Sequence, residues 1–300
     1  MSPWVLRGLR DGVVTTRWPA RPDPYAEGWR GPAVVLDARS DRVANLVSLC
    51  PTGSISQGSD GEVTLDQGCC ILCGRCVQER PDVFGWSRGA AAAALSRTGL
   101  VVPEIGETDQ GLAAVRAALA ARTAALRRSV HLRHVDAGSD GAEEQEIAAL
   151  LNPVYDIHRL GIFFTASPRH ADVLLVTGAG AHGMAEPLRR TYAGMPDPKI
   201  VIAIGTDAVS GGLLGGNAED TAADGTPRQP VSGDGAPAGG TSASAGIPGG
   251  SYATSGGVGA VVPVDVWIPG SPPPPFAILH GLLAGLGRLP GRQESEGARR

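Results

Sequence analysis

The sequence predicts two folded parts: a small α+β part that holds all the cysteines, followed by an α/β part with a doubly wound parallel sheet. Three observations lead to this prediction. All five cysteines of the 300 residues fall between Cys50 and Cys76. Strand-like and helix-like segments alternate from residue 129 to residue 289. Residues 211–257 interrupt that alternation with Gly, Ala, Ser, Pro and Thr.

The composition narrows the classes of function. The net charge is −4 and only 4% of the residues are aromatic, so neither a basic nucleic-acid surface nor a base-stacking platform is expected. No apolar run reaches the roughly 18 residues that a spanning helix needs, and no signal-peptide layout is present. We expect a cytoplasmic chain without a transmembrane segment, in which clustered cysteines bind a metal rather than form disulfides.

The elements are expected in the following order. Residues 1–90 form the cysteine-bearing domain, rich in turn-forming residues. A helix is predicted over 109–128, from the sequence DQGLAAVRAALAARTAALRR, within a helical linker that covers 91–128.

The α/β domain is expected over 129–290. Strands are predicted in SVHLRHVDAG, ADVLLVTG, KIVIAIG and GAVVPVDVWIPG, and helices in EEQEIAALL, MAEPLRRTYAGM and FAILHGLLAGLGRL. Residues 211–257 are predicted to be a flexible insertion, because they have too few large apolar side chains to offset the entropy lost on ordering. Residues 291–300 are predicted to be a disordered tail.

Three cysteines have the C-x-x-C-x-x-C spacing of an iron–sulfur ligand run: Cys70, Cys73 and Cys76. Such a run normally continues x-x-x-C-P, but Arg80 occupies the position of the fourth cysteine, before Pro81. In two-cluster ferredoxins the fourth cysteine of each run binds the other run's cluster, so the missing ligand should lie upstream before a proline. Cys50, in SLCPTGSI, fits that position.

The same rule tests the other cluster of the pair. Counting back from Cys50, its first three ligand positions fall on Ser40, Val43 and Leu46, and its fourth falls on Arg80. None of these side chains is a cluster ligand. One site is therefore absent as a complete set and the other is retained as a complete set, which predicts one [4Fe-4S] cluster held by Cys50, Cys70, Cys73 and Cys76.

Two alternatives remain open at this site. A structural zinc site with four cysteine ligands would use the same thiolates, although zinc sites favour two separated C-x-x-C pairs. Cys69, which precedes Cys70, is expected to be a buried or peripheral thiol, but it could compete with Cys70 as the ligand.

Residues 1–90 resemble the two-cluster ferredoxin subunits of formate hydrogenlyase and of complex I, including the opening segment WVLRGLRDGVVTTRWP. The resemblance implies a ferredoxin-like fold and transfer of single electrons rather than bond-making chemistry.

Residues 129–289, apart from the insertion, resemble the small subunit of membrane-bound nickel–iron hydrogenases and the twenty-kilodalton subunit of complex I. The resemblance rests on NPVYDIHRLGIFFTASPRHADVLLVTG, MAEPLRRTYAGMPDPKIVIAIG and VVPVDVWIPGSPPPPFAILHGLL. It implies a flavodoxin-like fold and a large-subunit partner. The family's [4Fe-4S] ligands, however, are replaced here, and the four positions fall on Asp140, Glu143, Asp207 and Ser271. Oxygen ligands do not hold a cubane under ordinary conditions, so this second cluster is expected to be lost.

A third motif, GAGAHG at 178–183, matches the G-x-G-x-x-G pattern of dinucleotide-binding turns. The strand before it is the second predicted in the domain rather than the first, and no clear acidic residue closes a later strand about 20 residues on. A glycine-rich turn without a nucleotide is therefore favoured.

Together these features predict an iron–sulfur electron-transfer subunit of a hydrogenase-related or complex I-like assembly, rather than a complete enzyme. Its partners would be the large subunit and the membrane subunits, placing it on the cytoplasmic face of the membrane. The alternatives are a non-redox scaffold subunit with a structural cluster and a dinucleotide-binding oxidoreductase. The replaced positions are predicted to converge, and to bind a basic group of the large subunit or, less favourably, a hard cation such as Mg²⁺ or Ca²⁺. The alternative for an isolated subunit is that the carboxylates extend into water where the family's cluster lies.

Overall fold

The computed structural model describes residues 3–21, 28–38, 46–58, 61–103, 109–126, 129–214 and 253–289. Most of the insertion expected at 211–257 and all of the tail expected at 291–300 lie outside these residues. Among the described helices, none is long and apolar enough to cross a membrane.

The first part of the chain contains two small antiparallel sheets, in which β1 pairs with β4, and β3 lies between β2 and β5. Its apolar core includes Leu46, Ile55, Leu65, Cys70 and Phe84. The ferredoxin-like fold expected here stays a prediction. The helices and strands of this part are α1 (Pro3–Asp11), β1 (Arg30–Val35), β2 (Ile55–Gln57), β3 (Val63–Asp66), α2 (Arg75–Glu79), β4 (Phe84–Arg88) and β5 (Val101–Val102).

The second part is an α/β domain built on one five-stranded parallel sheet with the order β10-β9-β8-β6-β7. Numbered within the domain, the order is 2-1-3-4-5, which is the flavodoxin-like arrangement. Its elements are α3 (Asp109–Thr123), β6 (Val130–Asp136), α4 (Ala142–Ala149), β7 (Ile162–Phe164), β8 (Val173–Thr177), α5 (His182–Ala193), β9 (Ile200–Ile204), α6 (Gly205–Ser210), β10 (Val266–Ile268) and α7 (Pro275–Gly285).

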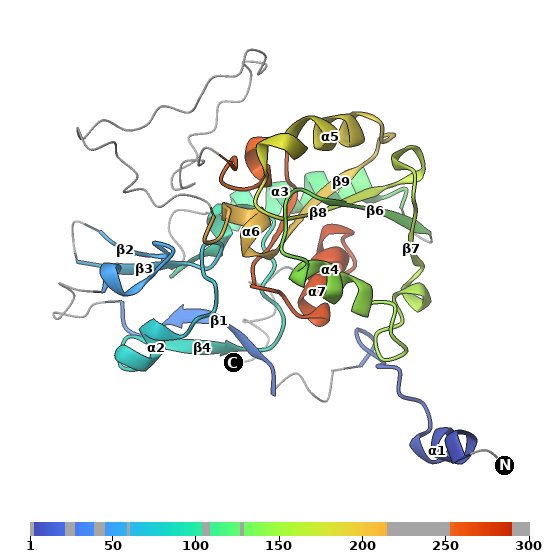
Figure 1. Ribbon diagram of the computed structural model, residues 1–300, viewed down its shortest axis with the longest axis horizontal. Coiled ribbons are helices and arrows are strands. Elements are labelled where there is room, and N and C mark those ends of the chain that lie inside the picture. The colour runs from blue at the N-terminus through green and yellow to red at the C-terminus, as the bar shows by residue number, and fades with distance from the viewer. Residues whose placement is uncertain are drawn as a thin grey trace.

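Helices cover both faces of this sheet, so the predicted doubly wound architecture is confirmed. Side chains of α3, α4 and α7 pack against one face, and those of α5 and α6 pack against the other; Figure 1 shows α5 on the opposite side of the sheet from α4 and α7. All residues of β8 and β9 are buried, as expected for strands covered on both faces. Every residue of α7 is buried as well.

The two parts contact one another directly. Ala94 and Trp267 of β10 exchange two backbone hydrogen bonds of 2.9 and 2.8 Å. Gly68, in the loop before the cysteines, packs so tightly on α6 that an added Cβ would lie 2.7 Å from Val209. By contrast, α1 has no buried residue and stands apart from both parts in Figure 1.

The structure differs from the expected elements in three places. The helix predicted over 109–128 ends at Thr123, and Leu126 then turns into the core. The segment GAVVPVDVWIPG forms a strand only over β10, because Pro263 has no N–H to donate to a sheet. The sequence reasoning also missed β7 and α6, which are three and six residues long and too short to show a periodic pattern.

Candidate iron–sulfur site

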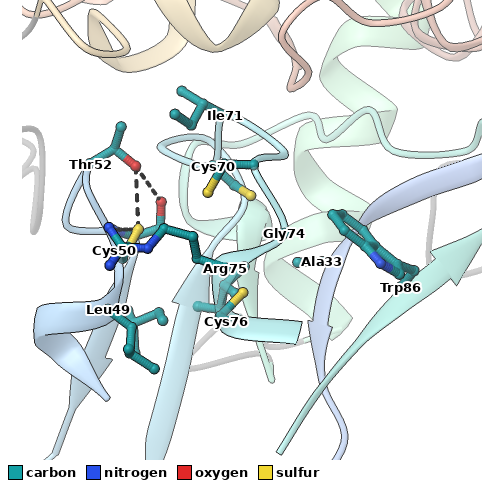
Figure 2. Close-up of a pocket in the computed structure, with 14 residues that line it drawn as sticks. Ala33, Leu49, Cys50, Thr52, Cys70, Ile71, Gly74, Arg75, Cys76 and Trp86 are labelled. Carbon is teal, nitrogen blue, oxygen red and sulfur yellow. Dashed lines mark hydrogen bonds between the residues drawn. The ribbon is translucent and has the colours of Figure 1, made fainter. Parts of the chain in front are cut away.

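The four cysteines of the predicted cluster line a single pocket in the first part of the chain. Cys50 follows a single 3₁₀ turn, Cys70 and Cys73 lie in the loop between β3 and α2, and Cys76 lies in α2. Figure 2 shows Cys50, Cys70 and Cys76 arranged around the pocket. The structure therefore brings together residues that are up to 26 positions apart in the sequence.

The rest of the lining is mainly apolar. Leu49, Ile55, Leu65, Ile71 and Trp86 contribute side chains, and the pocket spans about 350 Å³ when its open mouth is included. An apolar wall limits the access of water, which is one of the factors that set the potential of an iron–sulfur group.

The loop backbone curves around the pocket through two left-handed residues. Leu72 has φ 58° and Gly74 has φ 77°. The left-handed region is unfavourable for a leucine by roughly 1–2 kcal/mol, and such strain is often found at functional sites. A side chain at Gly74 would lie 3.1 Å from the Trp86 ring, so glycine is also needed there for the close approach of the tryptophan.

Hydrogen bonds to the sulfur atoms distinguish the thiols. The Ser54 N–H donates to Cys50 Sγ at 3.2 Å, and Thr52 Oγ1 lies 3.4 Å from the same sulfur. Burial raises the pKa of Cys50, but these contacts with Ser54 and Thr52 outweigh it, so the pKa lies below the ordinary value of a thiol. Hydrogen bonds to sulfur also stabilise the thiolate form that a metal requires.

Cys70 and Cys76 show the opposite shift. Burial raises the pKa of Cys70 to about 11, although the Leu72 backbone N–H acts against the shift, and the charges of Cys50 and Cys76 add to it. Burial likewise raises the pKa of Cys76, with contributions from Cys50 and Cys73. Four thiolates this close repel one another unless positive metal ions neutralise them. The thiol set therefore has the ligand chemistry of a metal site.

Within the described residues, no three His, Cys, Asp or Glu side chains are grouped closely enough to hold a single metal ion. A tetrahedral zinc ion would need all four sulfurs at about 2.3 Å from one centre, whereas a cubane gives each cysteine an iron of its own. Thiolates can hold either group, so metal analysis distinguishes the two.

Cys69 does not line the pocket. Its sulfur donates to Asp66 Oδ2 at 3.3 Å and accepts from Arg97 Nη2 at 3.5 Å, and Arg97 binds both oxygens of Asp66 at 2.8 and 2.6 Å. Burial, followed by the Asp66 charge, raises the pKa of Cys69 to about 12. Cys69 is thus a buried thiol at the contact with the second part, and Cys70 is the residue that faces the pocket.

Of the four positions counted for the ferredoxin cluster that is expected to be missing, two are described, and both have ordinary structural roles. Leu46 is buried in the core. Arg80 forms two hydrogen bonds of 2.8 Å with Asp82 at the surface. Ser40 and Val43 lie outside the described residues.

The four replaced ligand positions of the α/β domain all lie at the carboxyl ends of its strands. Asp140 and Glu143 follow β6, Asp207 follows β9, and Ser271 follows β10. The charges of Asp140 and Asp207 both act on Glu143. Ser271 joins the group through its neighbour Gly270, which accepts a 2.7 Å hydrogen bond from the Thr206 N–H beside Asp207. The structure thus brings the four positions to one edge of the sheet.

Comparison with known proteins places the α/β domain in a family. Residues 141–285 match the family model described as NADH ubiquinone oxidoreductase, 20 Kd subunit. The "Probable membrane-bound hydrogenase subunit mbhJ" of Pyrococcus furiosus is 36% identical over 164 residues, which are 55% of this chain and 78% of the relative. The chain belongs to the twenty-kilodalton subunit family.

Two further relatives in the twenty-kilodalton subunit family are less completely covered. Formate hydrogenlyase subunit 7 of Escherichia coli is 34% identical over 181 residues, which are 60% of this chain and 56% of the relative. An NADH-quinone oxidoreductase subunit of Desulfovibrio desulfuricans is 37% identical over 129 residues, which are 43% of this chain and 51% of the relative. The chain thus spans little more than half of each. The family match begins at residue 141, so the fusion with a ferredoxin subunit stays a prediction.

The glycine-rich turn GAGAHG has a packing role in this member of the twenty-kilodalton subunit family. It follows β8, the third strand of the sheet in chain order, and a Cβ on Gly178 would lie 2.5 Å from the backbone of residues 138 and 139. The N–H groups of Ala179 and Ala181 donate to the carbonyls of Gly138 and Ala137. These donors are engaged by the protein itself, which favours the structural interpretation over dinucleotide binding.

One contact of the site had no signal in the sequence. Thr206 Oγ1, from the first turn of α6 beside Asp207, donates a 2.9 Å hydrogen bond to the carbonyl of Cys70. Thr206 is completely buried, so the contact is shielded from water. It links the cysteine loop directly to the edge where the four replaced ligand positions lie. Only the fold reveals it, because 136 residues separate the partners.

Proposed function

We propose that this chain is an iron–sulfur electron-transfer subunit of a hydrogenase-related or complex I-like assembly. The observation that carries the proposal is that Cys50, Cys70, Cys73 and Cys76 surround one apolar pocket. The relatives' names add support, because they are subunits of formate hydrogenlyase, of a membrane-bound hydrogenase and of NADH-quinone oxidoreductase. The proposed partners are a large catalytic subunit and membrane subunits, with this chain peripheral on the cytoplasmic face.

The proposed cofactor is one [4Fe-4S] cluster in a ferredoxin-type domain spanning residues 1–90, with a linker to 128 and the α/β domain from 129 to 290. When bound, the cluster would accept and release single electrons. The residues of the chain have supporting roles. The four thiolates would hold the cluster. The Ser54 N–H and the Thr52 hydroxyl stabilise the charge on Cys50, and the apolar wall beside Trp86 limits the access of water.

The α/β domain has a different role in this proposal. With carboxylates and a serine at its ligand positions, it holds no cluster of its own and instead presents the cysteine domain to the partner subunit. The Thr206–Cys70 hydrogen bond and the Asp66–Arg97 pair support this role, since both lie where the two parts meet.

The test is metal analysis of the anaerobically purified chain. We expect about four irons and four acid-labile sulfides per chain, and a visible absorbance that bleaches and recovers on reduction and reoxidation. Cys73→Ser should lose most of the iron. Cys69→Ser is the matched control: its hydroxyl can still donate to Asp66, it lies outside the pocket, and it should retain the iron.

The outcomes separate the alternatives. Stoichiometric zinc without sulfide would show a structural zinc site and refute the proposal. A cluster that is present but cannot be reduced reversibly would favour the scaffold interpretation.

A further inference from the structure

The carboxyl group of Glu143 lies in an unusual position. Glu143 belongs to the first turn of α4, and only 2% of its surface is exposed. Its side chain rests on the turn after β9, where a Cβ added to Gly205 would lie 2.4 Å from Glu143 Oε1. Gly205 has φ +90°, so two separate features restrict that position to glycine. The carboxylate is thus buried at the edge of the sheet.

One oxygen of this buried carboxylate is left without a partner by the described part of the chain. Glu143 Oε2 has no hydrogen-bond partner among the described residues. The ion pairs among the described residues involve acidic side chains other than Glu143. A buried polar atom without a partner costs about 1–3 kcal/mol, and more when charged. Such a group requires an explanation in a native structure.

Two more carboxylates increase the negative charge at the same edge. Burial raises the pKa of Glu143 to about 7, and the charges of Asp207 and Asp140 act in the same direction. Burial and Asp140 together also raise the pKa of Asp207. Asp140 is exposed and Asp207 is half-buried, so the group extends from the interior to the surface, and a cation arriving from outside can reach it.

An apolar surface borders these carboxylates. Asp207 folds against Gly212, and the next two residues, Leu213 and Leu214, are 67% and 60% exposed. Two exposed leucines beside a buried acidic group resemble the centre of a protein interface, where apolar contact surrounds a desolvated charge.

We propose that the carboxylates of Glu143, Asp207 and Asp140 receive a basic side chain, best an arginine, from the large subunit, with Leu213 and Leu214 as the adjoining apolar contact. The proposal rests on the proposed function, which supplies the partner. A guanidinium carries five donors in a planar fork and can bind several carboxylate oxygens at once. Among the described residues, no three such side chains are grouped so as to hold one metal ion.

The experiment measures the affinity of the purified chain, with its cluster, for the purified large subunit. Glu143→Gln and Asp207→Asn remove the charge while keeping the shape of the side chain. Each should weaken binding at least about 30-fold, as expected when one partner of a buried charge pair is neutralised. The control is Glu186→Gln on α5, where the carboxylate is exposed and already paired with Arg190. This variant should change the affinity less than twofold.

A second readout separates docking from a merely structural role. Near pH 6.5, binding of the large subunit should remove a protonated-carboxyl stretching band from the infrared spectrum, and the Glu143→Gln chain should lack that band before and after binding. The thermal stability of the isolated variants should not fall, since their own repulsion is relieved. Variants that weaken the isolated fold and the complex together would indicate only a structural role.

Two results overturn the proposal. Unchanged affinity in both variants would show that the carboxylates face water in the complex. Stabilisation of the isolated wild-type chain by Mg²⁺ or Ca²⁺, lost in both variants, would assign the edge to a cation instead. Iron and sulfide are measured in the same preparations: their absence, with wild-type binding intact, refutes the proposed electron transfer and leaves the docking result standing.

Discussion

The buried carboxyl of Glu143 should make the stability of this chain depend on pH in a predictable direction. Its pKa rises from 4.5 to about 7 on folding, first because of burial. Between these two pH values the folded chain retains a proton that the unfolded chain has released, so the free energy of unfolding falls as pH rises. The loss from this group is complete above pH 7 and amounts to about 3 kcal/mol.

Glu143→Gln replaces the carboxyl with a neutral group of the same shape and should remove this dependence. The variant should be more stable than the wild type by about 1 kcal/mol at pH 5.5 and by about 3 kcal/mol at pH 8.5. For a domain of this size the larger difference corresponds to a melting temperature about 6–12 °C higher. The assay is anaerobic thermal unfolding of both chains across this pH range, followed by tryptophan fluorescence.

The difference between the two chains at each pH is the informative quantity, because other titrating groups cancel in it. Glu186→Gln, which removes an exposed carboxylate on α5, should differ from the wild type by less than about 0.5 kcal/mol at every pH. Parallel curves for the wild type and Glu143→Gln would show that Glu143 is solvated, and the reasoning about an unsatisfied buried carboxylate would be wrong.

Two further predictions concern the cysteine domain. Thr206→Val deprives two buried backbone groups of their hydrogen-bond partner and should lower the free energy of unfolding by about 2–4 kcal/mol. The control Thr191→Val, whose hydroxyl bond on α5 is exposed, should lower it by less than about 1 kcal/mol. Equal losses for the two variants in thermal unfolding would contradict the buried contact. Cluster reconstitution should be faster at pH 8.5 than at pH 6.5, because burial raises the pKa of Cys70 to about 11 and the ligands must lose their protons on binding iron. A rate of iron–sulfur absorbance recovery that falls over this pH range would contradict the assignment.

The sheet was predictable because its strands have a strong local signal. The segments that became β8 and β9 are continuous apolar runs, as expected for strands buried on both faces. The strand order was not visible in these patterns, since each strand can pair with any other. Short elements were missed for a related reason: β7 has three residues, and its pairing with β6 is a property of the whole sheet.

The cysteine pocket was predictable for a different reason. Ligand spacing is a covalent constraint, so Cys70, Cys73 and Cys76 restrict the geometry before any tertiary structure forms. The spacing rule selected Cys70, and it left the adjacent Cys69 open as a competitor. The structure separates them through Asp66 and Arg97, which hold the Cys69 sulfur away from the pocket.

The contact between Thr206 and Cys70 gives the two sites a common electrostatic requirement. A group held by four thiolates carries net negative charge, and hydrogen bonds and nearby charges tune its potential. Thr206, whose hydroxyl donates to the Cys70 carbonyl, is followed directly by Asp207. The carboxylates at the edge of the sheet therefore begin one residue from a contact with the cysteine loop. If the proposed cluster is bound, a positive group at this edge would favour both sites, since the carboxylates need a counter-charge and added negative charge on the cluster would be easier to accept beside one. An arginine from the large subunit would supply both effects at once, and an electron arriving at the cysteine domain would then lie next to the surface through which this chain contacts its partner.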